Sequence, residues 1–147
     1  KIYYNSVGNN SLMLLNIPPN KNGLFDKKDV KRLKEMGCWI KREEELIVKN
    51  AKTEISDGGF TINVKFPKQS VDRIHLAEDT AKSQRVEKFS IYADGKKLFD
   101  GTIIGFSRIA VFEPVETDAL TIKIEQCRKE PYINKAVPVA TGAYRVK

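Results

Sequence analysis

Cysteine, histidine and long apolar runs are scarce in this sequence of 147 residues, and each shortage excludes a class of protein. Two cysteines are too few for a small disulfide-held scaffold, and together with a single histidine they cannot build an ordinary zinc site. The longest apolar run, LMLL at residues 12–15, is far shorter than the ~20 residues that a membrane-spanning helix requires. We therefore expect a protein without a bound metal or cofactor and without a membrane partner.

Positive charge is in excess, but it is spread along the chain. The sequence has 26 Lys and Arg against 19 Asp and Glu, a net charge of +7. Basic and acidic residues alternate, as in KREEE at 41–45 and RKE at 128–130. Such interleaving is typical of a solvated surface, and no nucleic-acid-binding motif accompanies it. A hydrophobic content of 41% also excludes intrinsic disorder. The composition thus predicts a folded protein without a nucleic-acid partner.

Residues 1–45 show the pattern of one β/α unit. The apolar run LMLLNI at 12–17 stops at two prolines, which predicts a strand covered on both faces, as in parallel sheets. Asp26 is a good N-cap for a following helix. The apolar stripe of that helix is Val30, Leu33, Met36, Gly37 and Ile40. One unit cannot cover its own sheet, so we expect this chain, which begins at Lys1, to be a fragment whose partner elements lie outside it.

Residues 46–147 switch to a period of two. Apolar and polar residues alternate within the segments 60–66, 74–76, 89–93, 109–111 and 120–124. Turn sequences such as DGG at 57–59 and DGK at 94–96 separate these runs. The cadence predicts a mainly β domain, an antiparallel β-sandwich or jelly roll, with its boundary near residue 45.

Four motifs occur in order in the first part: YYNSVG (3–8), LMLLNIPPN (12–20), GLF (23–25) and DVKRLKEMG (29–37). The series is similar to the end of the catalytic barrel in glycoside hydrolase family 29, the α-L-fucosidases. In that family a Leu-Leu-Asn-Ile-Pro strand precedes a glycine turn and a helix ending near a glycine and a tryptophan, here Gly37 and Trp39. The YYNSVG motif and the proline pair at 18–19 resemble the branch of the family that cleaves α-1,3/1,4-linked fucose. The resemblance implies that residues 1–45 are the last strand and helix of a (β/α)₈ barrel.

Three further motifs extend the resemblance: IHLAED (74–79), QRVEKF (84–89) and GTIIGFSRI (101–109). They are similar to the discoidin-like sandwich of galactose-binding-like fold that follows such barrels, although Ser83 replaces a glycine usual in the family. A parent enzyme of this family would hydrolyse terminal α-L-fucosyl linkages with retention of configuration. The partners so implied are fucosylated glycans and the remainder of the catalytic barrel. Members of the family are commonly exported, which implies a periplasmic or secreted location.

No catalytic residue is predicted within the chain. Retaining hydrolysis needs two carboxyl groups about 5–5.5 Å apart, and in the family both precede the motifs found here. Barrel active sites form where the strands end, which places Asn16 at the active-site rim. Its amide either bonds a neighbouring active-site group or satisfies backbone groups at the strand end.

Sugar binding by the sandwich would combine an aromatic face with a few convergent polar groups. The candidate carbohydrate-binding residues are Arg85, Phe106, Arg108 and Tyr132. For two of them a structural role is the alternative: Phe106 as a core or interface aromatic, and Arg85, with Glu78 and Gln84, as a loop support or barrel contact.

Three further residue types are assigned structural roles. Trp39 is expected to pack against the sandwich as an interface anchor, because a large aromatic at a junction buries much apolar area. His75 is expected to be a solvated strand residue. Cys38 and Cys127 lie in different halves, and whether they pair is left open.

The leading interpretation is the C-terminal portion of an α-L-fucosidase in which the sandwich supports the barrel. The alternative is a stand-alone carbohydrate-binding module of galactose-binding-like fold, and a third possibility is an interaction domain for another protein. Scaffold and binding sandwiches share the same alternating strands, so the sequence does not separate these interpretations.

Overall fold

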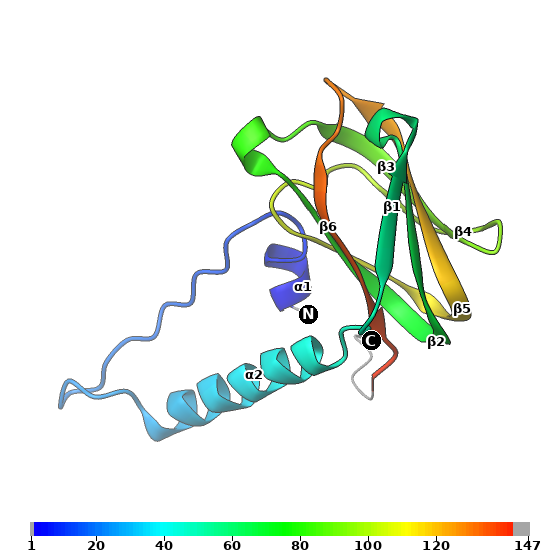
Figure 1. Cartoon of the computed structure of the whole chain (residues 1–147). Coiled ribbons are helices and arrows are strands. Elements are labelled where there is room, and N and C mark those ends of the chain that lie inside the picture. Colours follow the sequence, from blue (N-terminus) through cyan, green and yellow to red (C-terminus); the bar gives the residue numbers. More distant parts are fainter. Residues whose placement is uncertain (1, 143–147) are drawn as a thin grey trace.

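Two helices precede six β-strands in the computed structural model, which describes residues 2–142 (Figure 1). The helices are α1 (Ile2–Ser6) and α2 (Lys27–Glu45). The strands are β1 (Lys52–Ser56), β2 (Thr61–Glu78), β3 (Val86–Ala93), β4 (Lys96–Gly101), β5 (Arg108–Cys127) and β6 (Ile133–Ala140). Two short 3₁₀ helices, η1 (Asp57–Gly59) and η2 (Thr80–Lys82), lie in the loops. No described helix is both long and apolar enough to cross a membrane.

Helix α2 begins where the sequence predicts. The carboxylate of Asp26 accepts a hydrogen bond of 2.8 Å from the Lys28 amide and so satisfies one of the free N–H groups of the first turn. Asp29 adds a negative charge near the positive end of the helix dipole. The helix projects away from the sheet, and only its C-terminal end reaches the strands (Figure 1).

The strand predicted at residues 12–17 is not formed. These residues have no regular structure, and Leu12 and Leu14 are 83% and 88% exposed. A strand needs a hydrogen-bonded neighbour, and the last pairing of this segment with the sheet is the isolated bridge between Asn9 and Arg108. The segment instead runs out alongside α2 (Figure 1). Its apolar side chains are therefore uncovered within the described part of the chain.

The predicted antiparallel β architecture is confirmed. Every strand pairing is antiparallel, and the strands follow the order β1-β2-β5-β3-β4, with β6 paired to β2. The separate runs expected at 60–66 and 74–76 are the two halves of one long strand, β2. Likewise β5 joins the runs at 109–111 and 120–124. The sequence does not predict strands β1, β4 and β6, because they carry little apolar alternation.

The sheet folds over on itself where β2 and β5 bend. Their pairing is interrupted between residues 65 and 69 of β2, around Pro67, which lacks the N–H that a regular ladder requires. The first half of β2 pairs with β1, and the second half pairs with β6. The two halves of the sheet thus face each other and enclose the core.

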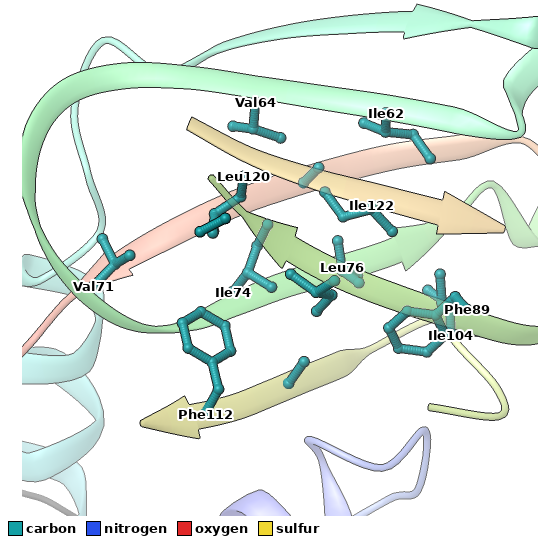
Figure 2. Packing of buried hydrophobic residues seen from close by; sticks show 14 of the residues in the cluster. Ile62, Val64, Val71, Ile74, Leu76, Phe89, Ile104, Phe112, Leu120 and Ile122 are labelled. Carbon is teal, nitrogen blue, oxygen red and sulfur yellow. The ribbon is translucent and has the colours of Figure 1, made fainter. Parts of the chain in front are cut away.

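The core is made of the inward-facing members of each alternating run. Figure 2 shows side chains from both halves of β2 and β5 meeting those of β3 in one cluster. The largest fully buried members are Phe89, Ile62, Ile74, Leu76, Ile91, Ile104, Leu120 and Ile122. Because the β2 and β5 residues come from both halves of bent strands, this cluster fixes the fold of the sheet.

Truncation of Leu120 is expected to destabilise the protein strongly. Its side chain is fully buried, so Leu120→Ala leaves a cavity and should lower the free energy of unfolding by about 2–5 kcal/mol. The matched control is Ile55→Ala, since Ile55 is 54% exposed and its loss should cost about 0.5 kcal/mol or less. Urea denaturation of the two variants measures both values; equal losses would contradict this core.

Candidate functional site

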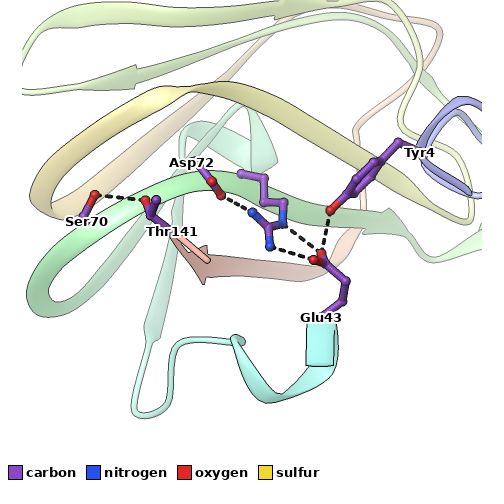
Figure 3. Close-up of polar contacts among 6 residues, drawn as sticks. Tyr4, Glu43, Ser70, Asp72 and Thr141 are labelled. Carbon is purple, nitrogen blue, oxygen red and sulfur yellow. Dashed lines mark hydrogen bonds and ion pairs between the residues drawn. The ribbon is translucent and has the colours of Figure 1, made fainter. Parts of the chain in front are cut away.

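A buried cluster of polar side chains joins the helices to the sheet (Figure 3). The Arg73 guanidinium on β2 donates to both carboxylate oxygens of Glu43 on α2, with Nε–Oε2 and Nη2–Oε1 distances of 2.9 Å each. The Tyr4 hydroxyl of α1 donates to Oε2 of the same carboxylate at 2.7 Å. Asp72 contacts the remaining side of the guanidinium. We call these four residues the clamp.

The clamp satisfies its charges without solvent. Glu43, Asp72 and Arg73 are each less than 5% exposed. A buried charge is tolerated only when it is paired and hydrogen-bonded, and the two-pronged guanidinium matches the carboxylate geometry. Burial and the hydrogen bond to Glu43 raise the pKa of Tyr4, so its hydroxyl stays protonated and acts as the donor. The clamp is therefore a specific connection between α1, α2 and β2.

Aromatic rings surround the helix side of the clamp. The Trp39 ring meets the rings of Tyr3 and Tyr4 edge to face, each with centroids 5.4 Å apart. The expectation that Trp39 packs on the sandwich is thus wrong, because Trp39 packs on α1. The Tyr4 hydroxyl of α1 bonds Glu43, and Glu43 in turn bonds Arg73 on β2. Cys38 and Cys127 are both free cysteines.

His75 follows Arg73 on the same outward face of β2, but it is not the solvated residue that the sequence predicts. Its Nε2 atom is buried and has no hydrogen-bond partner in the part of the chain that the structure describes. Burial, with the nearby charges of Lys135 and Arg73, lowers the pKa of His75 from 6.5 to about 4. The face that receives the helices therefore holds a neutral imidazole.

A second buried carboxylate organises the loops at one end of the sandwich. Oε1 of Glu78 accepts from the backbone N–H groups of Arg85 (2.7 Å) and Val86 (3.0 Å), and Oε2 accepts from that of Gly105 (2.7 Å). Glu78 is only 2% exposed. The loops at 79–85 and 105–108, which contain the candidate sugar-binding residues Arg85, Phe106 and Arg108, are thereby held together.

Asn10, from the N-terminal segment, docks on this same loop end. Its Nδ2 donates to Oε1 of Gln84 at 2.9 Å, and its Oδ1 accepts from the Phe106 amide at 2.8 Å. Its own amide donates to the Ser107 carbonyl at 2.8 Å. A carboxamide side chain can donate and accept at once, so one residue connects the N-terminal segment to two loops.

The four candidate sugar-binding residues lie at this loop end, and two of them, Arg85 and Tyr132, contact each other. Arg85 lies over the Tyr132 ring, 4.8 Å from its centroid, and Lys82 also approaches that ring, at 3.9 Å. Arg108 donates to Asn9 at 2.6 Å and lies 5.6 Å from the Phe99 centroid.

Phe106 and Asn16 differ from these in exposure. The Phe106 ring is 50% exposed and so remains available to a ligand. Asn16, proposed for the barrel rim, is exposed in the segment that follows Asn10. Among the described residues, no group of three or more His, Cys, Asp or Glu side chains is placed to hold a metal ion.

Loss of the Glu43 carboxylate should destabilise the protein far more than loss of its neighbour's. Glu43→Ala leaves the Arg73 guanidinium buried with half of its partners, and we expect about 3 kcal/mol or more to be lost. Glu44→Ala is the matched control, because Glu44 is exposed on the same helical turn. Chemical denaturation measures both; a small loss at both positions would show that the clamp does not hold the helices.

Acid should weaken the fold through His75. Its pKa is lowered in the folded state, so the stability it contributes is present above pH 6.5 and declines as the pH falls toward 4. The full difference corresponds to about 3 kcal/mol. His75→Gln removes the titration, so its unfolding free energy should change less than that of the parent protein between pH 6.5 and 4. If the unfolding free energies of the two proteins changed equally with pH, the lowered pKa of His75 would be contradicted.

The family comparison agrees with the resemblance seen in the sequence. The model of the α-L-fucosidase family matches residues 2–45, the part that contains α1 and α2. The rice (Oryza sativa subsp. japonica) protein named "Putative alpha-L-fucosidase 1" is 26% identical over 172 aligned positions, which cover 90% of this chain and 33% of the rice protein.

Solved structures extend the similarity to the sandwich. A protein of Bacteroides thetaiotaomicron VPI-5482, named "putative alpha-L-fucosidase", superimposes with a TM-score of 0.85 at 28% identity over 95% of this chain and 33% of its own. A glycoside hydrolase 29 family member from an unknown rumen bacterium gives a TM-score of 0.81 at 28% identity over 97% of this chain and 28% of its own. This chain therefore spans about a third of the length of these relatives, and along nearly all of its own length it is similar to one part of each of them.

Proposed function

We propose that this chain is the C-terminal portion of an α-L-fucosidase that hydrolyses terminal α-L-fucosyl linkages, of α-1,3/1,4 type, with retention of configuration. In this proposal residues 1–45 complete a (β/α)₈ barrel, and residues 46–147 form a galactose-binding-like sandwich that supports it. The substrates of the parent enzyme are fucosylated glycans, and the enzyme is exported to the periplasm or secreted.

The observation that carries the proposal is the uncovered apolar surface of the segment that precedes α2. Leu12 and Leu14 are more than 80% exposed, and Leu24 and Phe25 are 66% and 54% exposed. Burying one such side chain contributes about 1.5–3 kcal/mol, so these residues favour a neighbouring element. The barrel strands and helices that a β/α unit requires would supply that cover, and relatives about three times as long have the chain length to provide it.

Two grooves between the N-terminal segment and α2 give this surface its shape. One, of about 420 Å³, is lined by side chains that include Met13, Met36 and Trp39. The other, of about 220 Å³, includes Ile17 and Leu33. In the proposed barrel the strand containing residues 12–17 would close toward α2 and fill these grooves, with Asn16 at the active-site rim.

The supporting role rests on the clamp. Arg73 and Glu43 attach the C-terminal end of α2 to the sandwich through two charge-assisted hydrogen bonds in a buried setting. Asn10 attaches the start of the segment at 11–17 to the sandwich loops. A sandwich fixed at both points would hold the last barrel unit in position.

Hydrolysis of 4-nitrophenyl α-L-fucopyranoside by the full protein in which these residues occur tests the function. We expect release of nitrophenol by that protein and none by residues 1–147 alone, because the two catalytic carboxylates would lie on other barrel strands. Proton NMR during the first turnover should detect the α-anomer of fucose, as retention requires.

Two outcomes would count against this function. Release of the β-anomer would contradict retention. No turnover by the full protein, together with saturable binding of a fucosylated oligosaccharide by residues 1–147, would favour the alternative of a carbohydrate-binding module.

A further inference from the structure

The loop end of the sandwich contains a small groove that the proposed hydrolysis does not use. It has a volume of about 210 Å³ and lies between the start of β3, the loop after β4 and the end of β5. Pockets for drug-sized ligands occupy about 300–1,000 Å³, so this groove suits one ring rather than a chain of rings.

Two arginines line the groove, and the fold holds each in place. Arg85 donates through Nε to the Lys82 carbonyl (2.9 Å) and through Nη1 to the Glu130 carbonyl (2.8 Å). These bonds leave Nη2 for a further acceptor. The backbone amide of Arg128 donates to the Arg85 carbonyl at 3.0 Å, which keeps the two residues adjacent.

The second guanidinium also retains donors. Arg128 donates through Nε to Glu87 at 2.8 Å, and its side chain is 75% exposed. That ion pair involves Nε rather than the two terminal nitrogens. The groove therefore has two guanidinium groups and one carboxylate, a net positive charge.

The remaining lining suits a sugar ring better than a bare anion. Ile103 is 38% exposed, so the groove has an apolar side chain for C–H groups. Thr102 and Gln84 add a hydroxyl and an amide for ring hydroxyls. The Gln84 oxygen already accepts from Asn10, which orients the amide nitrogen as a donor.

We propose that this groove binds a single acidic sugar residue, carrying a carboxylate or a sulfate, at the edge of a glycan. The anionic group would be bound by the terminal nitrogens of Arg85 and Arg128, since guanidinium groups bind such oxyanions through paired hydrogen bonds. The ring would lie against Ile103. This inference is independent of the fucosidase proposal, because it concerns residues of β3, β5 and their loops.

Saturation-transfer NMR and calorimetric titration of the full protein with monosaccharide probes test the proposal. The probes are methyl glucuronide, galactose 6-sulfate, neutral galactose and sodium sulfate, at constant ionic strength. We expect at least one acidic sugar to bind at least tenfold more tightly than galactose and inorganic sulfate. The carboxylated and sulfated probes separate the two sources of negative charge.

Arg128→Ala is the deciding variant, and Lys129→Ala is its matched control. Arg128 is exposed, so its loss should leave the fold intact and weaken binding of the acidic sugar about tenfold or more. Lys129 is a neighbouring exposed cation that does not line the groove, and its loss should change affinity less than twofold.

Three results would overturn the proposal: equal weakening by both variants, equal binding of galactose, or binding of sulfate as tight as that of the acidic sugars. Absence of saturable binding of any acidic probe would do so as well. Turnover of the nitrophenyl fucoside, measured on the same samples, reports on the fucosidase proposal separately.

Discussion

The Arg73–Glu43 pair is the interaction on which the arrangement of this chain depends. Helix α2 is 19 residues long and projects from the sheet, so only its last turns can be fixed by the sandwich. At about 1.5 Å per residue, the stretch from its start to Glu43 is about 24 Å long. The direction of such a long helix depends on a rigid attachment at its end. Two parallel hydrogen bonds within a buried site restrict both the distance and the angle between the Arg73 guanidinium and the Glu43 carboxylate.

Much of the fold could be predicted because alternation and capping are local properties. Asp26 marked the start of α2, and the runs around Ile62 and Ile122 were recognised as strands. The predictions that were wrong concern features that depend on neighbouring elements of the fold. Residues 12–17 have the composition of a buried strand, yet a strand forms only beside another, and none of the described strands pairs with them. The sequence also does not predict that β2 continues through Pro67, because proline cannot donate a backbone hydrogen bond and so favours a break in a strand.

The partners of the buried carboxylates could not be predicted, although the positions of these residues carry information. Glu43 continues the helical stripe that runs through Met36 and Ile40, so an acid occupies a place where packing is expected. Glu78 lies two residues beyond Leu76 and four beyond Ile74, on the core-facing side of β2. A charge on a buried face requires partners, but the sequence does not say which. Arg73 is 30 residues from Glu43, and the Gly105 amide is 27 residues from Glu78.

The two attachments together show how the sandwich holds the N-terminal part of the chain. Asn10 binds the chain to the loop end of the sandwich. Glu43, near the C-terminal end of α2, binds it to the sandwich a second time. Between these points, Asn20 closes a tight turn by accepting from the amides of Asn22 and Leu24, so the connection is short and defined. The sandwich thus fixes both ends of a stretch made of an irregular segment, a turn and α2, in which Leu12, Leu14 and Leu24 are exposed. Fixing the ends lowers the entropy lost when that stretch packs against a neighbouring element, so the sandwich can favour that packing.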